Sequence, residues 1–143
     1  SVVVPKFAQN LSEANEQTLE TNINYTIDVP ENITGVVVDA KGLGMQATFA
    51  PAIYDVDGRI VYGWQKVDHY YAINHGLVQY ATNFAEQNRA GDNPLILKAL
   101  SVRGGKNSTN PVNAVVSKED GDRIILASKK FGIFHRCAVV FVK

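Results

Sequence analysis

The chain has little cysteine, and this scarcity excludes two classes of small protein. Cys137 is the only cysteine among its 143 residues. A fold held together by disulfides and a cysteine-based zinc site both need several thiols, so neither is expected. At this length a single domain can bury an adequate hydrophobic core without such cross-links.

The chain also lacks an excess of charge of either sign and a long apolar run. Its 14 Lys and Arg residues balance 14 Asp and Glu residues. Binding of nucleic acid needs a basic patch, so we expect no nucleic-acid partner. No stretch approaches the roughly 20 apolar residues of a membrane helix, so we expect no membrane span. A net charge of zero gives little self-repulsion, which favours self-association.

No complete catalytic, nucleotide-binding or metal-binding motif is present, and we expect neither an enzyme nor a bound cofactor or metal. The glycines of Gly42-x-Gly44-x-x-Ala47 follow an apolar run, as in a dinucleotide-binding fingerprint. That site needs a helix behind the glycines, and Pro51 leaves no room for one. We interpret these glycines as a tight turn or bulge beside a sheet.

The histidines are poorly spaced for joint chemistry. His69 and His75 lie about 240° apart around a helix, so they cannot share a metal-binding face. His135 and Cys137 would lie on one side of a strand, but the apolar run after the thiol indicates a buried structural cysteine. An enzyme using Asp39 with His69 or His75 stays an open hypothesis, which requires these side chains to converge in a pocket.

The carboxylates show no spacing that selects a catalytic pair. Four of the candidates are Asp39, Asp55, Asp57 and Asp68. A further cluster comes after Ser117, and we interpret it as charge that complements the dipole of a first helical turn. Its members are Glu119, Asp120 and Asp122.

The stretch "IYDVDGRIVYG" (residues 53–63) fits either a calcium loop or a hairpin. A calcium loop that begins at Asp55 needs an oxygen ligand at position 5, Gly at position 6 and Glu at position 12. Those positions hold Arg59, Ile60 and Lys66. The hairpin fits instead, with Asp57 and Gly58 as a type I′ turn. We predict that these two residues are scaffold.

Hydrophobic periodicity predicts an α+β fold: a single domain with a mixed, mostly antiparallel sheet, two helices on one face and an extended N-terminal arm. The arm covers residues 1–34 and the compact domain residues 35–143. Predicted strands are 22–29, 35–40, 51–56, 59–64, 94–102, 113–117 and 137–142. A short helix is predicted after Ser12, and longer ones over 67–89 and from Ser117 through Phe131.

The N-terminal arm is polar apart from its apolar tip, Val2, Val3, Val4 and Phe7. We predict that this tip contacts another subunit as an added strand. We also expect Ser1 to follow a removed secretion signal. Four N-x-Ser/Thr sequons mark candidate glycosylation sites: Asn10, Asn24, Asn32 and Asn107.

Four stretches of the sequence, taken together and in order, resemble a known module: "GVVVDAKGLG", "PAIYDVDGRIVYG", "GDNPLILKAL" and "CAVVFV". The module occurs in bacterial envelope proteins related to the small outer-membrane lipoprotein and flagellar accessory family. The resemblance covers roughly residues 34–143. It implies an exported structural or interaction protein, and it offers no catalytic residues.

These observations favour a secreted or cell-surface structural protein that assembles with itself, as a subunit of an extracellular filament linked by N-terminal strand addition. An open, non-closing contact of this kind produces a fibre. The alternative is a monomeric envelope module that binds a protein or glycan through clustered aromatics. Those aromatics are Tyr54, Tyr62, Trp64, Tyr70 and Tyr71.

Overall fold

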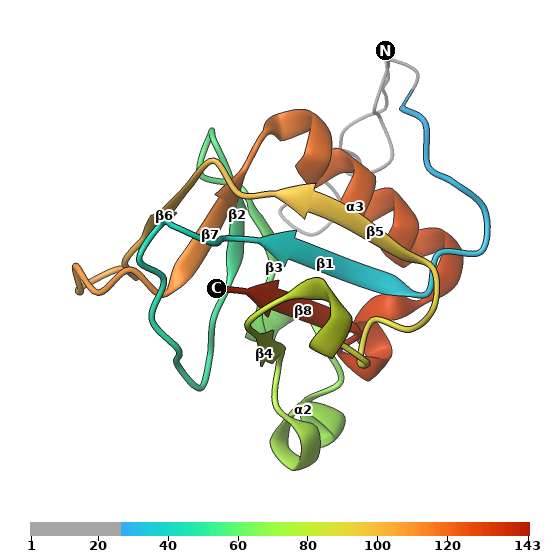
Figure 1. Ribbon diagram of the computed structural model, residues 1–143, viewed down its shortest axis with the longest axis horizontal. Coiled ribbons are helices and arrows are strands. Elements are labelled where there is room, and N and C mark those ends of the chain that lie inside the picture. Colours follow the sequence, from blue (N-terminus) through green and yellow to red (C-terminus); the bar gives the residue numbers. More distant parts are fainter. Residues whose placement is uncertain (1–26) are drawn as a thin grey trace, which may run out of the picture.

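The computed structural model describes residues 27–143, and it has the predicted α+β fold (Figure 1). The described chain contains eight strands in two sheets and two α-helices. It also has three short 3-10 helices, η1 (Trp64–Lys66), η2 (Phe84–Glu86) and η3 (Ile133–Arg136). The helix predicted after Ser12 lies outside the described residues, as does most of the strand predicted over 22–29.

The first sheet is parallel throughout, with the strand order β4-β8-β1-β5. Its central strand β1 aligns Val36 with Leu95 on one neighbour and with Val139 on the other. We call it the parallel sheet. Its strands are β1 (Gly35–Asp39), β4 (Gln79–Ala81), β5 (Pro94–Lys98) and β8 (Val139–Val142).

The second sheet, which we call the mixed sheet, has the order β3-β2-β7-β6. Its central pair β2 and β7 is parallel, and both outer pairs are antiparallel. Its strands are β2 (Ile53–Asp55), β3 (Ile60–Tyr62), β6 (Ser101–Arg103) and β7 (Asn113–Val116).

The prediction of one mostly antiparallel sheet is therefore wrong in its pairing. Strands that lie side by side come from distant parts of the chain, as β1 does between β5 and β8 (Figure 1). Parallel neighbours need long crossover connections, and these leave no local turn signal in the sequence. Among the strands of residues 27–143, only β2 and β3 are paired strands joined by a short turn of the kind that sequence can reveal.

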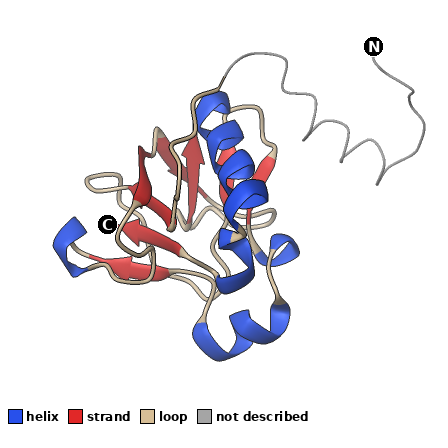
Figure 2. Ribbon diagram, turned by 90° about the vertical axis from the view of Figure 1, so that its right-hand side faces the viewer, coloured by secondary structure: helices blue, strands red, loops and turns tan. Residues whose placement is uncertain are grey.

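The main core lies where the two sheets and helix α3 (Lys118–Phe131) meet (Figure 2). It contains Val38 and Phe141 from the parallel sheet, Val61 from the mixed sheet, and Ile124 from α3. A smaller cluster around Val37 covers the other face of the parallel sheet. Burial on both faces explains why β1 and β8 are continuous apolar runs.

Helix α3 begins and ends as its sequence predicts. The Ser117 side chain accepts a hydrogen bond from the Asp120 N–H at 3.0 Å. Glu119 and Asp120 fall in the first turn, where carboxylates complement the helix dipole. Gly132 ends the helix with a φ of 65°, a left-handed conformation that glycine adopts without strain.

The helix predicted over 67–89 is wrong beyond its first two turns. Helix α2 spans only His69–His75, and Gly76 with a φ of 83° ends it. The chain then forms β4, so the helical spacing of apolar residues beyond Leu77 was misleading. Pairing with β8 in the parallel sheet stabilises this segment as a strand, despite the helical spacing of its apolar residues.

Two further boundaries differ from prediction. The strand predicted over 94–102 breaks after Lys98, so that β5 joins the parallel sheet and β6 the mixed sheet. The last strand begins at Val139, because Cys137 has a positive φ of 50° and follows η3. His135 and Cys137 therefore do not share a strand face.

Candidate functional site

The turn at 55–59 is built around the carboxylate of Asp55. Its Oδ1 accepts hydrogen bonds from the backbone N–H groups of Asp57 and Arg59, both at 2.9 Å. The Asp55 carbonyl accepts from Gly58 N–H at 3.0 Å. Asp57 and Gly58 are thus confirmed as turn residues, but the type I′ prediction is wrong. Only Gly58 has a positive φ, 86°, which is typical of a type I turn followed by a bulge.

Arg59 links this turn to helix α3. Its Nε lies 2.9 Å from Oδ2 of Asp55, and its terminal nitrogen lies 2.7 Å from Oδ1 of Asp122. Both carboxylates are buried, and Lys118 approaches Asp122 at 3.2 Å. Gly121 allows this approach, since a Cβ there would lie 3.1 Å from both Arg59 and Val61. The arrangement is structural, and the interpretation of Asp122 as helix-dipole charge missed it.

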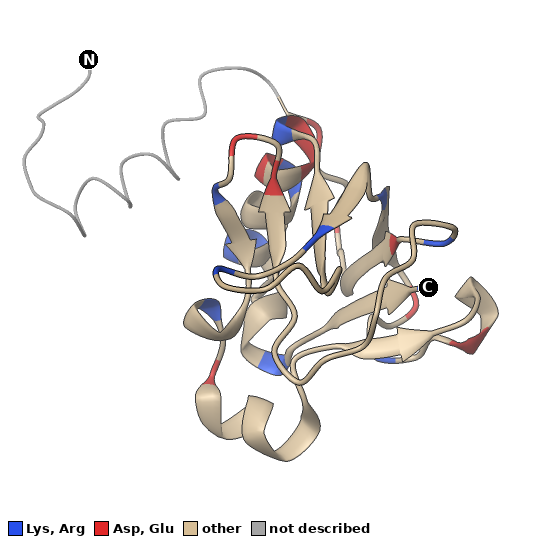
Figure 3. Ribbon diagram, turned by 90° about the vertical axis from the view of Figure 1, so that its left-hand side faces the viewer, with Lys and Arg blue, Asp and Glu red and all other residues tan. Residues whose placement is uncertain are grey.

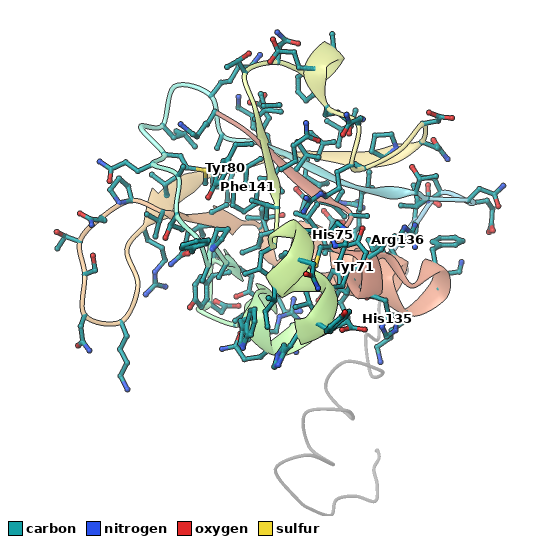
Figure 4. The ribbon with its side chains drawn as sticks, turned by 90° about the horizontal axis from the view of Figure 1, so that it is seen from below. Tyr71, His75, Tyr80, His135, Arg136 and Phe141 are labelled. Carbon is teal, nitrogen blue, oxygen red and sulfur yellow. The ribbon has the colours of Figure 1, made fainter. Side chains whose placement is uncertain are left out.

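Each residue of the enzyme hypothesis lies within hydrogen-bonding distance of a backbone group close to it in the chain. Asp39 accepts a hydrogen bond from Lys41 N–H at 3.0 Å. The His69 ring nitrogen lies 2.9 Å from the Trp64 carbonyl, and that of His75 lies 3.1 Å from the Tyr71 carbonyl. Figure 4 shows His75 beside Tyr71 on α2, and their rings stack at 4.1 Å.

Cys137 is buried against Tyr62 rather than poised for chemistry. Burial raises the pKa of the Cys137 thiol, and it raises the pKa of the Tyr62 hydroxyl as well. The Tyr62 hydroxyl donates to the Leu77 carbonyl at 2.7 Å. A thiol that is kept protonated is a poor nucleophile. Within residues 27–143, no group of three or more His, Cys, Asp or Glu side chains could hold a metal ion.

The glycines at 42 and 44 lie in a turn, both with positive φ, and no helix follows them before β2. This confirms their interpretation as turn residues. The helices of the described chain are also too short or too polar to cross a membrane.

The predicted aromatic cluster divides into buried and exposed members. Tyr62 is fully buried, and Tyr54 is half-buried under Arg103. Trp64 and Tyr70 are 40% and 80% exposed. An apolar pocket of about 430 Å³ lies beside Trp64. Its other lining residues are Phe49, Ala50, Ala72, Ile73 and Gly76.

Two exposed members of this apolar surface were missed from the sequence. Phe49 is 97% exposed, and Ile73 is 72% exposed. Phe49 lies in a loop without periodicity, and Ile73 lies within the helix predicted over 67–89, where helical spacing gives no sign of its exposure. Helix α2 contains no Lys, Arg, Asp or Glu, as Figure 3 shows, and its exposed apolar side chains are Tyr70 and Ile73.

A second surface feature is a shallow groove of about 380 Å³ along β5. β5 is the outermost strand of the parallel sheet, so one of its edges has no neighbouring strand among residues 27–143. Asp28 and Pro30 form one wall and Asp120 and Arg123 of α3 another. The β5 residues in the groove are Leu95, Ile96, Leu97 and Lys98.

The predicted contact and modification residues lie only partly within the described chain. Val2, Val3, Val4 and Phe7 lie outside it, together with the sequons at Asn10 and Asn24. Asn32 and Asn107 are both exposed. Asn32 lies in the turn before β1, where its carbonyl accepts a hydrogen bond from the Asn93 side chain at 3.0 Å.

Fold and surface together define a small α+β domain that has open sheet edges and an apolar pocket. Residues 35–143 match the family described as the second domain of Treponema pallidum Tp0624. The match covers most of the chain, so the protein belongs to this family. Comparison with the curated proteins finds no match.

Proposed function

We propose that this protein is an exported structural protein that assembles with copies of itself, as a subunit of an extracellular filament. The N-terminal arm is the connector, and its tip adds as a strand to a neighbouring subunit. The observation that carries this proposal is the open edge of β5, which lies in a groove beside Asp28, close to the start of the described chain. An exposed edge strand is a template for pairing with another chain.

Three sequence features support the proposal. The arm ends in an apolar tip, the net charge is zero, and two exposed sequons, at Asn32 and Asn107, suit a glycosylated outer surface. The resemblance to bacterial envelope modules adds the expectation of a secreted or cell-surface location. We assign no enzymatic activity.

Deletion of Ser1–Phe7 tests the connector. We expect the shortened chain to keep its circular dichroism spectrum and to stay monomeric by light scattering and electron microscopy. Deletion of residues 12–18, a stretch of the same length in which all but Ala14 are polar, is the matched control and should leave assembly intact. Assembly that survives loss of the apolar tip would show that the arm is not the connector.

The alternative function, an envelope binding module for a protein or glycan, is favoured by the apolar pocket beside Trp64. Exposed Trp and Tyr side chains are the usual anchors of such sites. Trp64 is the only tryptophan, so its emission reports on this pocket directly. Emission that shifts with a candidate envelope ligand in a chain that stays monomeric would favour this function. Loss of that shift in Phe49→Ala would place the ligand there.

A further inference from the structure

The outer edge of β5 is the longest open edge in the described chain. β5 has five residues, whereas the other three outermost strands, β3, β4 and β6, have three each. The Ala99 N–H donates to the Asp39 carbonyl at 2.9 Å, so it points toward β1. Successive N–H groups of a strand point in opposite directions, so this bond fixes which N–H groups of β5 face β1. Leu95 and Leu97 therefore turn their N–H groups toward β1, and Ile96 and Lys98 turn theirs outward.

The groove beside this edge is shaped to hold one more strand. Ile96 is 56% exposed on one side, and the buried Leu95 and Leu97 lie on the other. The chain's own segment at Asp28–Pro30 lines the groove without pairing with β5. Within residues 27–143, no strand pairs with the outward N–H groups.

We propose that this groove accepts the tip Val2–Phe7 of a second copy of the chain, as a fifth strand of the parallel sheet. The inference rests on the proposed self-assembly and identifies the β5 groove as the surface that accepts the N-terminal tip. Val2, Val3 and Val4 are β-branched and suited to a strand. Pro5 has no N–H, which is tolerated in an added outer strand when that position faces away from β5.

Charge and length also fit this occupant. Lys6 follows the valines, and the groove is lined by the carboxylates of Asp28 and Asp120 and by the cations of Lys98 and Arg123. Asp120 already pairs with Arg123 at 2.6 Å, so Asp28 is the carboxylate with which Lys6 would form an ion pair. Residues 8–26 separate the tip from the described chain, and an extended segment of that length spans up to about 65 Å. A domain of this size has a radius of gyration of about 13 Å, so the tip can reach a neighbour.

A contact between one copy's tip and the next copy's β5 is head-to-tail. It leaves the tip of the last subunit and the groove of the first unoccupied, so the assembly grows as an open filament. Main-chain hydrogen bonds would supply the affinity and the side chains of alternate residues the specificity.

Cross-linking between two single-cysteine variants tests the acceptor. Val3→Cys protein is mixed with Lys98→Cys protein and treated with a short bismaleimide, with wild type as the control for Cys137. The expected product is a covalent dimer that forms only in the mixture. A chain that carries both Val3→Cys and Lys98→Cys is treated in the same way. If it forms an internal cross-link as a monomer, the tip folds back on its own chain and the proposal is overturned.

Ile96→Pro removes one outward N–H from β5, and Ile96→Thr, which keeps it, is the matched control. We expect the proline variant to raise the concentration needed for assembly at least tenfold and the threonine variant to leave it within twofold. Circular dichroism and thermal melting check the fold. If deletion of Ser1–Phe7 abolishes assembly but Ile96→Pro does not, the proposed function stands and β5 is not the acceptor. If wild type stays monomeric at every concentration, both proposals fail.

Discussion

At the scale of single residues, Asp55 shows how one side chain can suggest a metal ligand and serve another purpose. Its carboxylate accepts two backbone N–H groups within its own turn and pairs with Arg59. These contacts use the oxygens that a calcium ion would need. The residues Asp55, Asp57 and Gly58 therefore form a self-contained turn.

Gly58 is the residue of this turn at which a side chain would strain the backbone. Its φ is 86°, and no atom lies within 4 Å of a Cβ built there, so the cost of a side chain comes from the backbone alone. We expect Gly58→Ala to lower the free energy of unfolding by about 1 kcal/mol. Gly58→Asn should cost less, because asparagine adopts positive φ more readily. Urea denaturation of both variants checks this, and equal losses would contradict a backbone origin.

The sequence could predict the position of this turn but not its type. Asp-Gly between apolar strands is a strong local signal, and the hairpin of β2 and β3 followed from it. A second irregularity, a shift of the pairing register between Ile53 and Tyr54, also has no local signal in the sequence. The same limit hid the partner of Arg59, because Asp122 is 63 residues away in the chain.

At the scale of elements, the Arg59 guanidinium joins the β2–β3 hairpin to helix α3. It lies between two buried carboxylates, one on each element, Asp55 and Asp122. Removing the guanidinium leaves both carboxylates buried without this partner. A buried ion pair that loses one member is strongly destabilised.

We expect Arg59→Met to lower the free energy of unfolding by about 3 kcal/mol, because the methionine fills part of the space but removes the cation that both buried carboxylates share. Lys118→Met is the matched control, since Lys118 also pairs with Asp122 but has a side chain that is 53% exposed. Its loss should stay below about 1 kcal/mol. Urea denaturation measures both, and similar losses would refute the bridging role of Arg59.

Elements that were predicted correctly share a strong local pattern, and those that were missed do not. β1 and β8 are continuous apolar runs, and α3 has a capping serine and a terminal glycine. β4 has only three residues, and its place is fixed by pairing with β8. The open edge of β5 was also beyond prediction, because it follows from the order of the strands and not from the strand's own residues.

At the scale of the whole molecule, buried groups that keep their protons in the folded state make stability depend on pH, and burial raises the pKa of Tyr80 as well as those of Cys137 and Tyr62. Burial raises the pKa of Cys137 above its ordinary value of 9.0 and that of Tyr62 above 10.0. Below pH 9 both groups are protonated whether the chain is folded or unfolded. Above it, the unfolded chain releases these protons and the folded chain retains them, so alkali favours unfolding.

We therefore expect the free energy of unfolding to fall as the pH rises above 9, first through Cys137 and above 10 through Tyr62 and Tyr80 as well. Each group contributes a slope of up to about 1.4 kcal/mol per pH unit. Urea denaturation at a series of pH values from 7 to 11 measures this slope. Cys137→Ala should remove the part that begins near pH 9 and leave the part due to Tyr62 and Tyr80. An unchanged slope in that variant would show that the thiol does not hold its proton in the folded chain.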